Sequence, residues 1–363
     1  MAKKVLFLVA HRPGRSPGQR FRFEQYIDYL RANGYQCDIS FLINDKDDSD
    51  FYAPGRYLAK ARILFKTLWH RLSDMKKAGQ YDLVFIYREV HMLGVTWFER
   101  FLKGRGVKMI LDFDDSIWIN DTSDGNRQFS WLKRPMKTAQ IAGLCDMVLV
   151  GNSFLEQWTL PFNNQVHIIP TTIDTQRYVP SLKSKTPGEK ICIGWTGSST
   201  TMKHLQVAVP VLREIQQKYR NQIIFRVISN KPLAADLLGL ENVAWNAESE
   251  VEDLYPIDIG IMPLPDNDWT RGKCGFKGLQ YMALEIPTIM SPVGVNSEII
   301  TDGVNGFLAN DPREWLEKLS ALIESPELRS RLGKAGRQTV IDRYSFNSQK
   351  ERYLKLFNSL IVS

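Results

Sequence analysis

Apolar and polar positions follow two alternating periodicities along the chain. Short apolar runs such as 4–10 have the length and composition of buried strands, and helical segments with apolar residues at i, i+3, i+4 and i+7 lie between them. Between the second and third runs we expect a polar loop over 44–50 and a long helix over 55–78. The first part of the chain therefore predicts a parallel sheet of about six or seven strands, with strands at 4–10, 36–42, 81–87, 107–113, 146–151 and 165–170.

The pattern changes between Thr171 and Glu189, where Pro180, Pro187 and Gly188 occur without any apolar periodicity. Alternation then resumes, with strands at 190–195, 223–229, 243–245, 257–263 and 288–291, and helices at 202–219, 276–284, 311–324, 326–344 and 346–361. We therefore predict two doubly wound α/β domains. Their predicted bounds are 1–175 and 190–340, with a linker over 176–189 and a C-terminal helical segment, 341–363, that packs on the first domain.

The composition is that of a globular protein, with 44% hydrophobic and 24% charged residues. No apolar run reaches the roughly 20 residues that span a bilayer, and the short N-terminal apolar run lacks a convincing cleavage site. The four cysteines, Cys37, Cys145, Cys192 and Cys274, are far apart and include no CxxC pair. We therefore expect reduced, buried thiols in a cytoplasmic protein, with neither disulfides nor a zinc site.

Most of the net charge of +7 lies in one segment. Residues 52–79 contain seven basic residues and one acid, Asp74, and therefore carry six of the seven net positive charges. Apolar residues are interleaved with them at helical spacing. Two interpretations stay open: a core-packed helix with a solvated basic face, or a helix over 56–78 that lies on an anionic membrane surface. The second would make the protein peripheral at the inner face of the cytoplasmic membrane.

In doubly wound sheets, ligands bind at the carboxyl ends of the strands, so we expect the binding site in the loops that follow strands. The loop 11–20 contains Gly14, whose backbone a ligand could approach closely, and Arg15 and Arg20, which favour an anion at the start of a helix. It contains no GxGxxG fingerprint, and a plain turn with solvated arginines explains it equally well. Arg88 directly follows the strand 81–87 and is a further candidate residue at the carboxyl end of this sheet.

Carboxylates gather at the end of the strand 107–113. Strand alternation puts Asp112 and Asp114 on one side, where they could contact a metal, sugar hydroxyls or a developing positive charge. Asp115 could instead cap the following turn. The pair is weak evidence by itself, and we predict no metal site.

The first strand of the second domain leads into a loop of small hydroxyl residues. Thr196, Gly197 and Ser198 are followed by Lys203 at the start of a helix, and these groups suit phosphate oxygens. A Ser/Thr helix cap with a surface lysine is the alternative. Ser229 and Asn230, at the end of the next strand, are assigned to the same site.

The segment 266–283 is the richest in candidate groups. It follows the strand 257–263 and places glycines, two lysines and an arginine directly before a helix, which suits a diphosphate. Gln280, one helical turn beyond Lys277, could contact sugar hydroxyls. The candidate ligands before it are Lys273, Cys274, Gly275, Phe276 and Lys277.

These motifs together resemble the retaining nucleotide-sugar glycosyltransferases of family 4. The resemblance covers nearly the whole chain, through 19–26, 112–118, 169–178, 193–198, 273–283 with Pro287, 291–298 and 303–307. It implies the GT-B fold, in which two Rossmann-like domains face a cleft and C-terminal helices cross back to the first domain. It also implies that the first domain holds the acceptor and the second the nucleotide sugar.

The resemblance also suggests roles for single residues. Lys203 is similar to the diphosphate-binding lysine of the family, and Asp114 falls where many members place a histidine at the donor sugar. Gln280 and Gly272 fall on the two glutamates of the E-x7-E motif, so this motif is absent in its usual form. Asp266, Asp268 or Lys273 could replace the lost sugar contact.

From the sequence we therefore expect a retaining glycosyltransferase that needs no cofactor and no metal. Asp114, Lys203 and Lys277 are the predicted catalytic residues, and Arg15, Arg20, Arg88, Asp112 and Asp115 are assigned to the acceptor side. The donor would be a UDP-, GDP- or other nucleoside diphosphate sugar, and the acceptor a glycan or a lipid-linked glycan of cell-surface polysaccharide synthesis. A nucleotide-sugar epimerase and a degenerate nucleotide-sugar-binding protein are the alternatives, whereas nucleic acid is not an expected partner.

Overall fold

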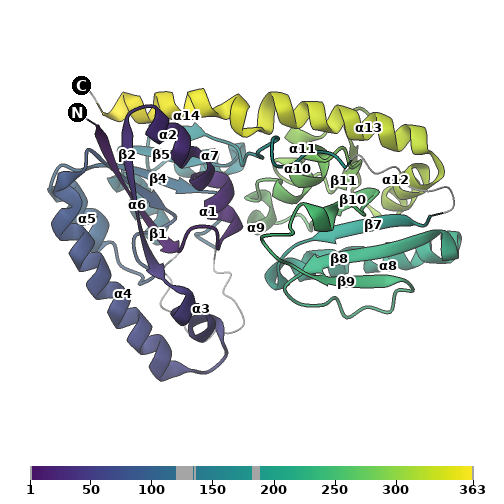
Figure 1. Cartoon of the computed structure of the whole chain (residues 1–363), viewed down its shortest axis with the longest axis horizontal. Coiled ribbons are helices and arrows are strands. Elements are labelled where there is room, and N and C mark those ends of the chain that lie inside the picture. The colour runs from purple at the N-terminus through teal and green to yellow at the C-terminus, as the bar shows by residue number, and fades with distance from the viewer. Residues whose placement is uncertain (1, 120–133, 135, 182–188, 362–363) are drawn as a thin grey trace. The chain divides into compact units, whose positions relative to one another are not determined.

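A computed structural model describes residues 2–119, 134, 136–181 and 189–361. The chain divides into two compact units, unit 1 (Met1–Pro170 with Lys350–Ser363) and unit 2 (Thr171–Gln349), which are coloured along the chain in Figure 1. Residues 182–188 of the predicted linker and the last two residues of the predicted C-terminal segment lie outside the described residues.

Unit 1 is built on a parallel sheet whose six strands follow the order β2-β1-β3-β4-β5-β6. Its centre is apolar: Phe7, Phe85 and Ile110, from three adjacent strands, are fully buried. The order reverses between β1 and β3, which makes this the switch point where doubly wound sheets bind ligands. The strands are β1 (Lys3–His11), β2 (Tyr35–Ile43), β3 (Leu83–Tyr87), β4 (Lys108–Phe113), β5 (Met147–Val150) and β6 (Val166–Ile168).

Helices surround this sheet, and the apolar pattern did not predict all of them. The segment expected as a polar loop is the helix α3 (Asp45–Tyr52). Its side-chain cap, Asn44, accepts a hydrogen bond from the Asp47 N–H at 2.9 Å, and acids in the first turn interact favourably with the helix dipole. The other helices are α1 (Pro17–Arg22), α2 (Ile27–Ala32), α4 (Tyr57–Lys77), α5 (Trp97–Gly104), α6 (Met136–Leu144) and α7 (Ser153–Thr159).

The last helix, α14 (Phe346–Leu360), contributes its second half to the core of unit 1. Tyr353 stacks on Tyr26 with ring centroids 4.2 Å apart, and Phe357 lies 6.0 Å from the ring of Phe85. Both C-terminal side chains are fully buried. The aromatic residues of the C-terminal segment therefore complete the hydrophobic core that begins with β1.

Unit 2 contains a second parallel sheet, in the order β12-β11-β10-β7-β8-β9. The order reverses between β7 and β10, so the loops after these two strands flank its switch point. The predicted strand 243–245 is wrong in its bounds, because β9 starts earlier and pairs with β8, and β12 was not predicted. The strands are β7 (Ile191–Thr196), β8 (Ile223–Ser229), β9 (Leu240–Ala244), β10 (Ile259–Met262), β11 (Thr288–Met290) and β12 (Phe307–Leu308).

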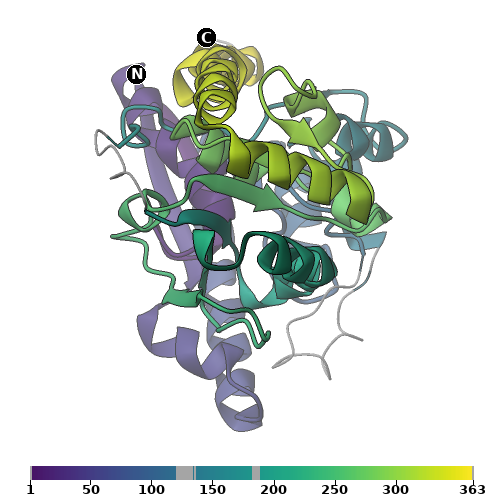
Figure 2. The same ribbon diagram turned by 90° about the vertical axis from the view of Figure 1, so that its right-hand side faces the viewer.

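The helices of unit 2 pack against one another: α8 contacts α12, α12 contacts α13, and α13 contacts α10. Figure 2 shows the chain turned by 90° from the view of Figure 1. Buried residues of α8 and α12, such as Leu212 and Leu319, share one hydrophobic core with the strands. This packing fixes where α8 and α10 begin, and both begin beside the switch point. The helices are α8 (Met202–Tyr219), α9 (Asp268–Arg271), α10 (Phe276–Ala283), α11 (Asn296–Ile299), α12 (Pro312–Glu324) and α13 (Pro326–Thr339).

Candidate functional site

The loop between β7 and α8 is held in a fixed conformation by its own hydroxyl groups. The Ser198 N–H donates to Thr201 Oγ1 at 3.1 Å, and Ser198 and Thr201 form a reciprocal cap. The Ser199 N–H donates to Asn230 Oδ1 at 2.6 Å, which ties this loop to the end of β8. The predicted residues Ser198, Ser229 and Asn230 are thus brought to one edge of the sheet.

Lys277 reaches this loop from the first turn of α10. Its Nζ donates to Thr201 Oγ1 at 3.2 Å and lies 4.2 Å from the centroid of the Trp195 ring. In the part of the chain that the structure describes, no carboxylate forms an ion pair with Lys277. Burial and, secondly, the positive charge of Lys273 lower the pKa of Lys277 to about 7.

Glycines make this approach possible. A Cβ at Gly197 would lie 2.7 Å from Lys277 Nζ and 2.4 Å from the Trp195 ring, so a side chain there would displace the ammonium group. Gly275 is the N-cap residue directly before α10. Its φ is +68°, a conformation that glycine adopts without strain. The predicted Gly197 and Gly275 therefore position Lys277.

Tyr281 links α10 to the same strand end. Its Oη accepts the Thr196 N–H at 2.7 Å, and its ring lies against Gly260 of β10, where a Cβ would come within 2.4 Å of it. The predicted residue Thr196 is buried, and its N–H is occupied by this hydrogen bond. This hydrogen bond could not be predicted from the sequence, because Tyr281 is expected to be an ordinary residue of the hydrophobic core.

His204, in the first turn of α8, is a further polar group that sequence reasoning missed. The side chain is 3% exposed, and neither ring nitrogen has a hydrogen-bond partner among the described residues. Burial, followed by the charges of Lys277, Lys273 and Lys203, lowers its pKa to about 4. The indole Nε1 of Trp195 is likewise buried without a partner in the described chain. Such groups are expected where a polar ligand completes the hydrogen bonds.

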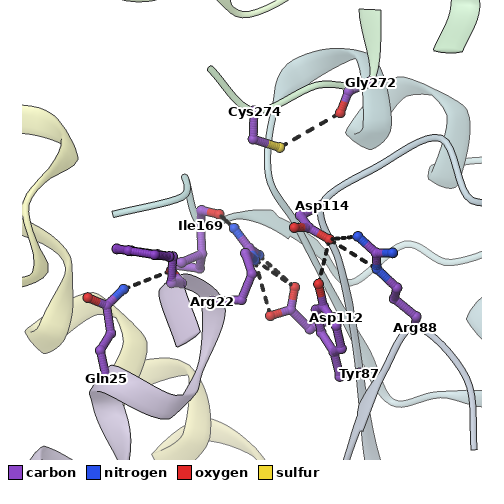
Figure 3. Close-up of polar contacts among 10 residues, drawn as sticks. Arg22, Gln25, Tyr87, Arg88, Asp112, Asp114, Ile169, Gly272 and Cys274 are labelled. Carbon is purple, nitrogen blue, oxygen red and sulfur yellow. Dashed lines mark hydrogen bonds and ion pairs between the residues drawn. The ribbon is translucent and has the colours of Figure 1, made fainter. Parts of the chain in front are cut away.

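The other residues predicted for this site lie in different surroundings. Lys203 is exposed on α8, and Lys273 lies over the Trp269 ring at 4.7 Å. Phe276 begins α10. The thiol of Cys274 is buried and donates to the Gly272 carbonyl at 3.8 Å between sulfur and oxygen (Figure 3).

Gln280 is buried and fixed by a chain of hydrogen bonds. Its Nε2 donates to Tyr178 Oη at 2.8 Å, and that hydroxyl donates to Glu250 Oε2 at 3.0 Å. The predicted contact between Gln280 and a sugar stays a prediction.

The switch point of unit 1 holds the Asp114 cluster, which we define as Tyr87, Arg88, Asp114 and Asp115. Figure 3 shows the first three of these residues. Arg88 Nη2 lies 2.7 Å from Asp114 Oδ1 and 2.7 Å from Asp115 Oδ2, and Tyr87 Oη donates to Asp114 Oδ1 at 2.8 Å. Arg88 adopts a φ of +67°, an uncommon conformation for a residue with a side chain.

Opposing effects set the ionisation of Asp114. Burial raises its pKa, but the charges of Arg88 and Arg22 and the hydrogen bonds from Arg88 and Tyr87 lower it, and the net pKa is below its usual range. Asp114 is therefore a carboxylate at neutral pH. Gly18 lies directly against it, because a Cβ there would come within 2.1 Å of Tyr87 Oη and 3.0 Å of Asp114 Oδ2.

Asp112 lies in a different environment from Asp114. It is fully buried and forms a bidentate ion pair with the equally buried Arg22, whose Nη2 lies 2.6 Å from Asp112 Oδ1 (Figure 3). Burial raises the pKa of Asp112 to about 6 against the opposing effect of Arg22. Arg22 is therefore enclosed in the core together with its counter-ion.

The loop after β1 contacts acidic residues from other segments of unit 1. Gly14 has a φ of +79°, and its N–H donates to Glu24 Oε2 at 2.8 Å. Arg15 Nε lies 2.7 Å from Asp48 Oδ2, and the guanidinium of Arg20 lies 5.0 Å from the Phe21 ring centroid. The role of Gly14, Arg15 and Arg20 in ligand binding stays a prediction. Asp48 comes from α3, the helix that the sequence pattern did not reveal.

The described residues contain no group of three or more His, Cys, Asp or Glu that could hold a metal ion. Among the helices of the described chain, none is both long enough and apolar enough to cross a membrane. All four cysteines are free and buried, as predicted.

Comparison with known proteins identifies similar chains. Residues 190–325, which lie within unit 2, match the family described as Glycosyl transferases group 1. The alpha-maltose-1-phosphate synthase of Mycobacterium tuberculosis is 24% identical over 276 residues, which cover 67% of this chain and 70% of the relative. With three other curated relatives the match spans between 18% and 41% of the relative's own length.

Solved structures share the fold over nearly the whole chain. A sucrose-phosphate synthase from Thermosynechococcus elongatus superposes with a TM-score of 0.75 at 15% identity, covering 99% of both chains. The Anabaena protein HepE in complex with UDP-glucose superposes with a TM-score of 0.67 at 11% identity, covering 98% of this chain and 99% of that one. The prediction of the GT-B fold, with two parallel sheets of this kind, is confirmed.

Proposed function

We propose that the chain transfers a sugar from a nucleoside diphosphate sugar to a glycan or lipid-linked acceptor, with retention at the anomeric carbon. The match of residues 190–325 to the glycosyl transferases group 1 family supports this proposal. The observation that carries the proposal is the position of Lys277. An ammonium group with no carboxylate partner in the described chain lies at the switch point of unit 2, beside a loop of small hydroxyl residues. These are the groups that a diphosphate requires.

The proposed chemistry follows from the charge that develops during transfer. Departure of the sugar leaves a negative charge on the diphosphate, and a preorganised cation stabilises this charge where water is excluded. Lys277 would supply that cation, with Lys203 and Lys273 as further positive charges. The Ser198 and Asn230 side chains would hold the rest of the nucleotide, and His204 and the Trp195 indole would find partners in the ligand.

Asp114 is the proposed carboxylate at the donor sugar. Its negative charge suits a positive charge that develops at the anomeric carbon, and Arg88 and Tyr87 hold its position. The acceptor side of unit 1 would include Arg15, Arg20, Asp112 and Asp115. Asp112 would contribute from the core, where it pairs with Arg22. The resemblance of the sequence motifs to family 4 implies this division, and we propose a role in cell-surface polysaccharide synthesis.

A binding screen tests the donor assignment. The full chain would be titrated with UDP-, GDP-, ADP- and TDP-glucose by calorimetry. We expect saturable binding of at least one of them, weakened about tenfold to hundredfold by Lys277→Met because a charged hydrogen bond to the diphosphate is lost. Lys334→Ala, which removes an exposed lysine from α13, is the matched control and should not change the affinity. Equal affinities for the wild type and Lys277→Met would discard the site.

Turnover separates the proposal from its alternatives. A transferase releases the nucleoside diphosphate only when a suitable acceptor is added, and the anomeric configuration of the product, read by NMR, reports retention. Conversion of the sugar without any acceptor would indicate an epimerase. Binding without turnover over a broad acceptor panel would indicate a nucleotide-sugar-binding protein, which the missing E-x7-E glutamates make worth testing.

A further inference from the structure

Helix α4 exposes a row of large apolar side chains. The positions 58, 65, 69 and 72 are separated by 7, 4 and 3 residues, so they lie along one side of the helix. The rings of Phe65 and Trp69 pack edge to face, 6.1 Å apart. A row of this kind marks an interaction surface rather than a face that meets only water. The exposed fractions are 89% for Leu58, 63% for Phe65, 61% for Trp69 and 42% for Leu72.

The opposite side of α4 is anchored, so the helix cannot rotate to bury this row. Ile63 and Thr67 are buried there, and Thr67 Oγ1 lies 3.0 Å from His91 Nε2. Arg71 is fully buried and donates to the Val90 carbonyl at 2.8 Å and the Val9 carbonyl at 2.6 Å. These bonds fix which side of α4 is exposed.

The neighbouring helix α5 continues the surface. It contacts α4, and its Trp97 and Phe101 are 68% and 40% exposed. The guanidinium of Arg105 lies 4.9 Å from the Phe101 ring, and Arg100 is exposed on the same helix. We call the exposed sides of these two helices the α4–α5 surface, which comprises Leu58, Phe65, Trp69, Leu72, Lys76, Lys77, Trp97, Arg100, Phe101 and Arg105.

Several cations of this surface form no ion pair with the residues that the structure describes. The only acids of the two helices point inward: Asp74 pairs with Arg71 at 2.8 Å, and Glu99 accepts the Val90 N–H at 3.2 Å. At the start of α4 the bases do have partners, since Arg62 and Lys66 lie 3.3 Å and 2.6 Å from the carboxylate of Asp47 in α3. The uncompensated charge therefore lies at the C-terminal half of α4 and on α5, where Lys76, Lys77, Arg100 and Arg105 are exposed.

We propose that the α4–α5 surface binds the surface of an anionic phospholipid bilayer. Exposed Trp and Phe rings partition into the boundary between headgroups and acyl chains, and lysine and arginine side chains beside them interact with lipid phosphates. Among possible partners an anionic bilayer matches both features at once, the exposed apolar row and the positive charge beside it. This contact requires neither nucleotide nor turnover, so it goes beyond the proposed function and does not rest on it.

Vesicle sedimentation of the full chain tests the proposal. We expect binding to phosphatidylcholine vesicles that contain phosphatidylglycerol and little binding to phosphatidylcholine alone. Lys76→Gln with Lys77→Gln should weaken binding to the anionic vesicles about thirtyfold, as expected for two cations near the surface. Phe65→Ser with Trp69→Ser should weaken binding to the same vesicles by tenfold or more. Leu238→Ser, which replaces a side chain in unit 2 that is 68% exposed, is the matched control and should bind as the wild type does.

Several results would overturn the proposal. Equal binding to both kinds of vesicle would do so, as would unchanged binding by the Phe65→Ser, Trp69→Ser variant. If light scattering shows a dimer that this variant abolishes, the surface binds a second copy instead, and preferential binding of single-stranded RNA would assign it to nucleic acid. The variants should keep the wild-type unfolding temperature and nucleotide affinity, so a failure here is distinguishable from a failure of the donor site.

Discussion

Nucleotide-sugar binding should depend on pH through Lys277. The pKa of its ammonium group is lowered to about 7 because the group is buried and lies near Lys273, with a hydroxyl and an indole ring as its recorded contacts. A bound diphosphate pairs only with the protonated form. Binding should therefore take up a proton and weaken as the pH rises above 7.

The magnitude follows from the protonated fraction of the free protein. With a pKa of about 7, roughly 90% of the lysine is protonated at about pH 6 and about 3% at about pH 8.5. The affinity should therefore fall about thirtyfold between these pH values. His204, with a pKa of about 4, is neutral over this range and adds nothing to the dependence.

Calorimetry in buffers of different ionisation enthalpy measures both quantities, the affinity and the number of protons taken up. Lys277→Arg is the matched variant, because a guanidinium stays charged throughout, and its affinity should be nearly independent of pH. A wild-type affinity that does not change between pH 6 and 8.5, or binding without proton uptake, would refute the reasoning.

The stability of the protein without ligand gives a second measurement of the same pKa. The unfolded chain has the ordinary lysine pKa of 10.5 and the folded chain a pKa of about 7. Between these values the unfolded state binds more protons, so this group makes the free energy of unfolding rise with pH. Urea unfolding of the wild type and of Lys277→Met should differ in this slope, and parallel slopes would contradict the lowered pKa.

Three further substitutions test the packing around the two switch points. Gly18→Ala places a methyl group 3.0 Å from Asp114 Oδ2 and should lower kcat/KM by about tenfold or more, with a stability loss of about 1–3 kcal/mol in urea unfolding. Arg22→Met leaves Asp112 as an unpaired buried carboxylate and should cost about 3–5 kcal/mol of unfolding free energy, partly restored by Asp112→Asn in the double variant. Gly278→Ala puts a Cβ 1.7 Å from the methyl group of Met290 in β11 and should destabilise unit 2 by about 1–3 kcal/mol. An unchanged unfolding temperature would contradict the tight packing at this position.

The strands and the long helices could be predicted because their periodicity is set by burial on one or two faces. The helix expected over 202–219 and the strand over 223–229 have the observed bounds of α8 and β8. α3 could not be found in this way, because its composition is almost entirely polar. Its acids instead stabilise the helix start and pair with Arg15 and Lys66, contacts that only the folded chain reveals.

The candidate site was predictable where it depends on one loop and was missed where it depends on distant segments. Glycines and lysines before α10 pointed to Lys277 directly. His204 was not identified as a site residue, because it lies in a helix whose apolar pattern predicts packing against the core. The hydrogen bond between Gln280 and Tyr178 joins residues 102 positions apart, so no local pattern could reveal it. In the same way, the strand pattern could not show that Asp112 and Asp114 take different arginines as partners.

The two switch points differ in how their charges are balanced, and this difference predicts the pH profile of turnover. Arg88 pairs with Asp114 and Asp115 and lowers the pKa of Asp114, whereas the described chain offers Lys277 no carboxylate. The profile of kcat/KM, which reports the free protein, should therefore be bell-shaped, with an acid limb from Asp114 and a basic limb near pH 7 from Lys277. Arg88→Met should move only the acid limb, to higher pH, and Lys277→Arg should abolish only the basic limb. If either variant moved both limbs together, the two groups would titrate as a coupled pair, and the assignment of one limb to each unit would be wrong.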